Sequence, residues 1–229
     1  MLKSKILPTI TTLDSPGSTW QDKIGELDEL GLEEVSLFLT GLDENKRKDL
    51  YQSLERTGVK KIPHVHLRTD MRSRELKYLE SLYKVEVFNT HPTKDYPLIY
   101  SWDEYFRKIF VENTRSLPDR KELCFFGGVC LDFAHWENAL LNDHSNYKGL
   151  ADILKDFSVG CAHLSAVKES PEKDDQGVPS YDFHTFDDLS EFDYLRKYLD
   201  YFPKIASLEL NNSLKEQLKV KEYIEFNIL

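Results

Sequence analysis

The chain has fewer basic than acidic residues: 30 lysines and arginines against 40 aspartates and glutamates, with a formal charge of −10 at pH 7. Proteins that bind nucleic acid through its phosphates present broad basic surfaces, so this composition argues against such a surface. Divalent cations bound at a site would cancel part of the negative charge at that place. DNA therefore has only weak support as a partner.

Long apolar runs and cysteines are also scarce. No stretch approaches the roughly 20 apolar residues of a membrane span, and the start MLKSKILPTITTLD lacks the apolar core of a signal peptide. We therefore expect no membrane association and a cytoplasmic location. Cys124, Cys130 and Cys161 are an odd number without CxxC spacing. This pattern favours free thiols in a reducing compartment over a disulfide framework, with Cys130 and Cys161 in buried strands.

Short apolar or β-branched runs recur along the 229 residues, with helical patterns between them. The expected strands are 5–12, 34–40, 60–67, 84–90, 107–112, 127–133, 159–165 and 204–210. Eight strands with intervening helices are typical of the (β/α)8 TIM barrel, an α/β fold. We predict a single domain of this kind over residues 1–229, a length that one barrel fills.

Helical periodicity marks most of the segments between these strands. A helix over 18–30 is expected to start at Ser18 and to end at Gly31. The other expected helices are 43–57, 71–83, 136–157 with a break near 142–146, 187–201 and 212–224. Region 113–127 is too short for a good helix. The polar segment 168–184 contains Pro and Gly and predicts a loop after the seventh strand, where loops of a barrel carry function.

Histidines and carboxylates follow one apolar run after another, in IPHVH, FNTH, IFVE, VCLDFAH, CAH and SLE, with a further pair in YDFH. The candidate metal ligands are His64, His66, His91, Glu112, Asp132, His135, His163, Asp182, His184 and Glu209. Side chains at the C-terminal ends of parallel barrel strands converge on one mouth. Imidazole and carboxylate groups are the ligands of zinc, manganese and iron, so the pattern predicts a metal enzyme.

Several of these residues have an ordinary explanation when each is taken alone. His163 could be a core histidine, and the D-x-H of Asp182 and His184 could be a solvated loop. Glu209 is different, because it interrupts SLEL in an expected buried strand, where an unpaired carboxylate is costly. His64 and His66 alternate and so face the same side of their strand. Either one could be the ligand and the other a supporting group.

The order and local spelling of these motifs resemble the endonuclease IV family of apurinic/apyrimidinic endonucleases, within the xylose-isomerase-like barrel superfamily. The matching segments are Pro63-His64, His91-Pro92, Glu112-Asn113-Thr114, Asp132-Phe133-Ala134-His135, His163-Leu164 with Lys168, Asp182-Phe183-His184 and Glu209. They occur in the family's order over almost the whole chain.

The resemblance implies up to three zinc ions and activation of water for attack on phosphorus. The first ion would take His64 or His66, His91 and Glu112; the second Glu112, Asp132, His163 and Glu209; the third His135, Asp182 and His184. Glu112, Asp132 and Glu209 are the candidate catalytic carboxylates. The implied substrate is a phosphoester.

The chain departs from that family in its loops. The family's tyrosine three residues after the strand-three histidine is replaced by Leu67, or by Thr69 if His66 is the ligand. Ser165-Ala166 stands in place of asparagine-aspartate, and Arg115-Ser116-Leu117-Pro118 in place of a glycine-rich stretch. The family's chains are generally longer, in loops that grip DNA. The scaffold and the metals are therefore better supported than DNA as the substrate.

Two further interpretations stay open. A sugar or sugar-phosphate isomerase or epimerase would need one Mn²⁺ or Co²⁺ ion held by Glu112, Asp132, His163 and Glu209, with two glutamates transferring protons. That interpretation fits the acidic charge and leaves His91, Asp182 and His184 unexplained. The third interpretation is a metal-binding barrel without catalytic activity, which no motif favours.

Overall fold

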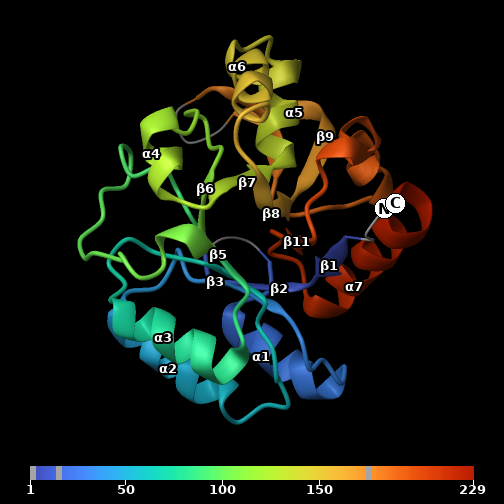
Figure 1. Cartoon of the computed structure of the whole chain (residues 1–229). Coiled ribbons are helices and arrows are strands. Elements are labelled where there is room, and N and C mark those ends of the chain that lie inside the picture. Colours follow the sequence, from blue (N-terminus) through green and yellow to red (C-terminus); the bar gives the residue numbers. More distant parts are fainter. Residues whose placement is uncertain (1–3, 14–16, 174–176) are drawn as a thin grey trace.

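The chain folds into a barrel of parallel strands surrounded by helices, as seen in a computed structural model that describes residues 4–13, 17–173 and 177–229 (Figure 1). The barrel strands are β1 (Lys5–Leu7), β2 (Thr9–Thr11), β3 (Ser36–Phe38), β4 (His64–His66), β5 (Val87–Thr90), β6 (Ile109–Glu112), β7 (Gly128–Asp132), β8 (Val159–Leu164) and β11 (Ile205–Leu208). Their order is β1-β11-β8-β7-β6-β5-β4-β3-β2, and every neighbouring pair is parallel. The predicted TIM barrel and its eight strand positions are confirmed.

The first predicted strand is divided at Pro8, and this division closes the barrel. The half before Pro8 pairs with β11, and the half after it pairs with β3. Proline has no N–H to give to a strand ladder, but its carbonyl accepts a hydrogen bond from Ser36 N at 2.9 Å. At the seam, the buried Gln217 side chain accepts from Thr9 N at 2.7 Å and donates to the oxygens of Thr9 and Leu210, both at 3.1 Å. The side-chain amide of Gln217 thus takes the place of backbone hydrogen bonds between the strands at the seam.

The helices lie outside the strands and follow the predicted ranges closely. They are α1 (Trp20–Glu29), α2 (Glu44–Leu54), α3 (Ser73–Tyr83), α4 (Arg120–Phe125), α5 (Phe133–Leu141), α6 (Asn146–Ile153) and α7 (Leu214–Tyr223). Helix α1 is capped at its N-terminus by Thr19, in a capping box with Asp22, and not by Ser18 as predicted. The expected break near 142–146 separates α5 from α6. Region 113–127 holds only the six residues of α4, as its length implied.

The prediction of a loop over 168–184 was wrong. Strands β9 (Ala166–Lys173) and β10 (Pro179–Phe183) form an antiparallel pair there, and residues 174–176 lie outside the described part. Most of β9 is exposed, so the polar composition of this segment reflects solvent contact and not irregular structure. Segment 187–201 is the 3₁₀ helix Leu189–Tyr201, and a π-helical turn, Ile224–Ile228, follows α7.

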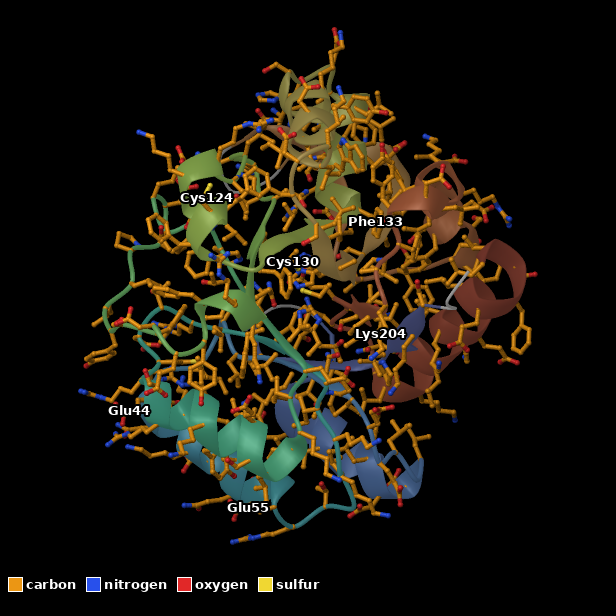
Figure 2. All side chains as sticks on the ribbon, viewed as in Figure 1. Glu44, Glu55, Cys124, Cys130, Phe133 and Lys204 are labelled. Atoms are coloured by element: carbon orange, nitrogen blue, oxygen red, sulfur yellow. The ribbon has the colours of Figure 1, made fainter. Side chains whose placement is uncertain are left out.

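The side chains fill the inside of the barrel and the space between strands and helices (Figure 2). Cys130 and Cys161 are buried as predicted, Cys124 is exposed on α4, and all three are free thiols. Across the described residues, no helix combines the length and apolar character needed to cross a membrane.

Candidate metal centre

The ends of four neighbouring strands bring three carboxylates and a histidine together inside the barrel mouth. Glu112 ends β6, Asp132 ends β7, His163 is the penultimate residue of β8, and Glu209 directly follows β11. One ligand atom from each lies within 4.8 Å of the others, and all four residues are buried. His163 Nδ1 is 3.0 Å from Glu209 Oε2, 3.4 Å from Glu112 Oε2 and 3.8 Å from Asp132 Oδ2. We call these residues the central group.

Buried polar atoms that form no hydrogen bond are concentrated here, although His163 Nδ1 and Glu209 Oε2 lie within ion-pair distance. Asp132 Oδ2, Glu209 Oε2 and both ring nitrogens of His163 form no hydrogen bond within the described residues, and neither does the nearby Asp182 Oδ1. An unsatisfied buried polar group typically costs about 1–3 kcal/mol, so such a cluster needs a partner. Oxygen and nitrogen donors converging in this way fit a divalent cation of the zinc or manganese type.

The charges of the central group depend on one another. Burial raises the pKa of Asp132 to about 7. Burial would also raise the pKa values of Glu112 and Glu209, but His163 and other histidines outweigh it. They hold the pKa of Glu112 well below its usual range and that of Glu209 at about 2. Against the effect of burial, the carboxylates raise the pKa of His163 to about 10. Positive charge is therefore favoured at this place, and a bound cation would supply it without a proton on His163.

A second group consists of Asp132, His135 and Asp182. His135 Nε2 lies 3.1 Å from Asp182 Oδ2, and Nδ1 lies 2.9 Å from the carbonyl oxygen of Asn113. Because a carbonyl only accepts, Nδ1 carries the proton and Nε2 is the atom that would bind a cation. His184 follows β10 and lies close enough to lower the pKa of Glu209, but its ring is in none of the ligand groups found among the described residues.

A third group consists of His66, Glu112 and His163. His66 Nε2 is 2.9 Å from Glu112 Oε2, while His66 Nδ1 contacts the carbonyl oxygen of Leu67 at 3.0 Å. His91 packs its ring against His66, with centroids 4.6 Å apart, and its Nε2 lies 3.9 Å from Glu112 Oε1. Burial lowers the pKa of His91 to about 4, which favours the neutral ring that a metal requires.

His64 is placed differently from His66. Its Nδ1 is 2.7 Å from Ser207 Oγ and its Nε2 is 2.9 Å from Asn89 Oδ1, so both nitrogens have partners. Asn89 Nδ2 in turn donates to Glu112 Oε2 at 2.9 Å. His66 therefore faces the carboxylates. His64 instead contacts the side chain of Asn89, and Asn89 donates a hydrogen bond to Glu112. Asn89 and Ser207 were not among the predicted site residues, although Asn89 stands two residues before His91 in the same motif.

Two hollows flank these groups. One, of about 410 Å³, lies beside His135 and includes Asn138, Asn142 and Asn146 in its wall. The other, of about 330 Å³, lies beside His91 and includes Arg68 and Tyr96. None of these five wall residues was predicted from the sequence. The closely spaced asparagines of 138–146 would have been the signal for three of them, and no pattern in the sequence points to Arg68 and Tyr96.

The fold can be compared with solved structures. The probable 3-DHS dehydratase AsbF from Bacillus anthracis matches with a TM-score of 0.50 and 14% identity, over 98% of this chain and 100% of that chain. The chain is a TIM barrel. Lower-scoring similarities are to SacUVDE (TM-score 0.47, 14% identity, 99% and 100% covered) and to the 3-keto-D-glucoside 4-epimerase YcjR from E. coli (0.42, 12%, 97% and 98%). No protein-family model and no curated protein matches. At these identities the likeness concerns the fold, and membership of the endonuclease IV family stays a prediction.

Proposed function

We propose that this TIM barrel is a metal-dependent hydrolase of phosphoesters with a multinuclear site at its mouth. The observation that carries the proposal is the sharing of carboxylates. Glu112 belongs to the central group and to the group with His66, and Asp132 belongs to the central group and to the group with His135. Carboxylates shared between adjacent ligand groups are suited to holding cations close together, as in the two-metal sites that cleave phosphoesters.

The chain's own residues would bind and orient the cations. His163 and Glu209 would complete the central group, His66 and His91 would hold a cation on one side of Glu112, and Asp182 with His135 would hold one beside Asp132. Bound divalent cations supply charge that neutralises phosphoester oxygens and favours ionisation of water. Asn89 orients the carboxylate of Glu112. The backbone carbonyl of Asn113 orients the ring of His135, and the Asn113 side chain holds the backbone of Asp132 through its N–H and its carbonyl oxygen, at 2.8 and 2.9 Å.

A second candidate is a sugar or sugar-phosphate isomerase or epimerase with one cation in the central group. The central group favours it: among the ligand groups of the described residues, this group alone has four residues, and all four are buried. The net charge of −10 also fits a small substrate better than DNA. Glu112 and Glu209 would then be available for proton transfer.

Metal content and substrate range separate the two candidates. The hydrolase should purify or reconstitute with about three zinc ions per chain and should cleave a small phosphodiester. Asp182→Ala should lower the zinc content by about one ion and abolish cleavage. A single manganese or cobalt ion, with ketose turnover that survives Asp182→Ala, would establish the isomerase instead.

A further inference from the structure

The hollow beside His135 has polar walls that the metal site does not use. We call it the amide cavity, formed by Thr114, Arg115, Asn138, Asn142, His144 and Asn146 together with His135. Its volume of about 410 Å³ lies in the range of pockets that enclose small molecules. It lies along α5 and α6, which sit together on one side of the barrel (Figure 1).

The hydrogen bonds within the wall fix how each asparagine amide is turned. Asn138 Oδ1 accepts a hydrogen bond from Tyr181 N at 2.9 Å, so the Nδ2 group of Asn138 remains for other contacts. Asn142 Nδ2 donates to the carbonyl oxygens of Asn138 and Pro179, at 3.0 and 3.2 Å. Asn146 Nδ2 donates to the carbonyl oxygen of Arg115. Each asparagine thus has one end committed to the protein.

The uncommitted ends are a mixture of donors and acceptors. The hydrogen bonds of the described residues engage Asn138 through Oδ1 and Asn142 and Asn146 through Nδ2, which leaves Asn138 Nδ2 as a donor and the other two Oδ1 atoms as acceptors for a ligand. His144 Nδ1 accepts from Asn146 N at 3.2 Å, so in the neutral ring Nε2 carries the proton and is a second donor. A hydroxyl group both donates and accepts, so it matches such a wall.

His135 connects the amide cavity with the metal centre. It lines the cavity, and its Nε2 lies 3.1 Å from Asp182 Oδ2. We propose that the amide cavity binds the hydroxylated, non-reacting part of the substrate, a sugar or polyol, while the reacting end reaches the metal centre past His135. This inference rests on the proposed function in that it takes the metal centre as the place of reaction.

The test is direct binding, measured by calorimetry on the metal-loaded protein with D-ribose, D-glucose, glycerol phosphate and inorganic phosphate as probes. At least one of the three hydroxylated probes should bind saturably at millimolar concentration. Ala139→Trp, whose new side chain enters the cavity from α5, should abolish that binding. His144→Ala should weaken it about tenfold, as expected for a lost hydrogen bond. Both variants should keep the wild-type metal content, and Gln21→Trp, at an exposed position on α1, is the matched control.

Three results would overturn the assignment: no saturable binding of any hydroxylated probe, unchanged binding in Ala139→Trp, or binding of inorganic phosphate alone that Ala139→Trp removes. Failure of the proposed function looks different. It would leave probe binding sensitive to Ala139→Trp in a protein that holds no metal or turns over no phosphoester.

Discussion

Asn89 offers the sharpest test of how the barrel orients a metal ligand. Its side chain is buried between His64 and Glu112, with 2.9 Å contacts to each. Asn89→Leu keeps the branched shape and the number of heavy atoms and removes both hydrogen bonds. Glu112 then loses the donor that fixes Oε2, and His64 Nε2 loses its acceptor. The carboxylate should become free to turn away from the two ligand groups that share it.

Two magnitudes follow from these contacts. Loss of a group that orients a metal ligand typically lowers metal affinity about 10–100-fold, which is roughly 1.4–2.7 kcal/mol. The buried His64 N–H left without a partner should lower the free energy of unfolding by about 1–3 kcal/mol. Competition with a chelator measures the zinc affinity, and urea denaturation measures the stability.

Thr90→Val is the matched control on the same strand. Thr90 is buried, and its Oγ1 has no hydrogen-bond partner among the described residues, so an isosteric methyl should leave zinc affinity unchanged. Asn89→Leu with wild-type zinc affinity would refute the role of Asn89. A loss of affinity in Thr90→Val as large as that in Asn89→Leu would show that any change on β5 disturbs the site.

Three other expectations follow from the structure. Glu112→Gln should remove zinc from both groups that share this carboxylate with little change in the circular dichroism spectrum; unchanged zinc content by mass spectrometry would contradict the sharing. Gln217→Met should lower the free energy of unfolding by about 2–3 kcal/mol in urea, because it leaves Thr9 N–H unpaired at the seam; wild-type stability would show that the seam does not need this amide. Burial lowers the pKa of Lys23 to about 7, so between pH 7 and about 10 the unfolded chain holds a proton that the folded chain has released. Stability should therefore rise with pH in that window, and Lys23→Met should reduce the slope in denaturation experiments at a series of pH values; an unaltered slope would exclude Lys23 as its source.

The sequence predicted the barrel well because parallel strands are buried on both faces and appear as short apolar runs. Period-two alternation placed His64 and His66 on one face of β4, but it does not tell how far each ring lies from the mouth of the barrel. Two residues span about 6.6 Å along a strand, and that step separates His66, which faces Glu112, from His64, which contacts Ser207 and Asn89. Only the closed barrel shows which ring reaches the mouth.

Features that depend on pairing across the fold were not predictable in the same way. Strand β9 is mostly exposed and β10 is mostly half-buried, and the polar residues of this segment do not differ from those of a loop in composition. The asparagine amides of the amide cavity acquire their orientation from Tyr181, Pro179 and Arg115, which belong to other segments. The cytoplasmic location, the single-domain boundaries and the identity of the metal stay predictions.

The seam of the barrel has a consequence for the order of folding. The barrel closes where Lys5 on β1 pairs with Ile205 on β11, and we expect this contact between distant parts of the chain to form after the local contacts. Glu209 directly follows β11, so the central group gains its last carboxylate only when that edge is in place. A cation held by Glu209 and by ligands on β6, β7 and β8 would therefore stabilise the closed barrel after the last strand has paired. Its binding energy becomes folding energy, and the metal-loaded barrel should open far more slowly than the metal-free one.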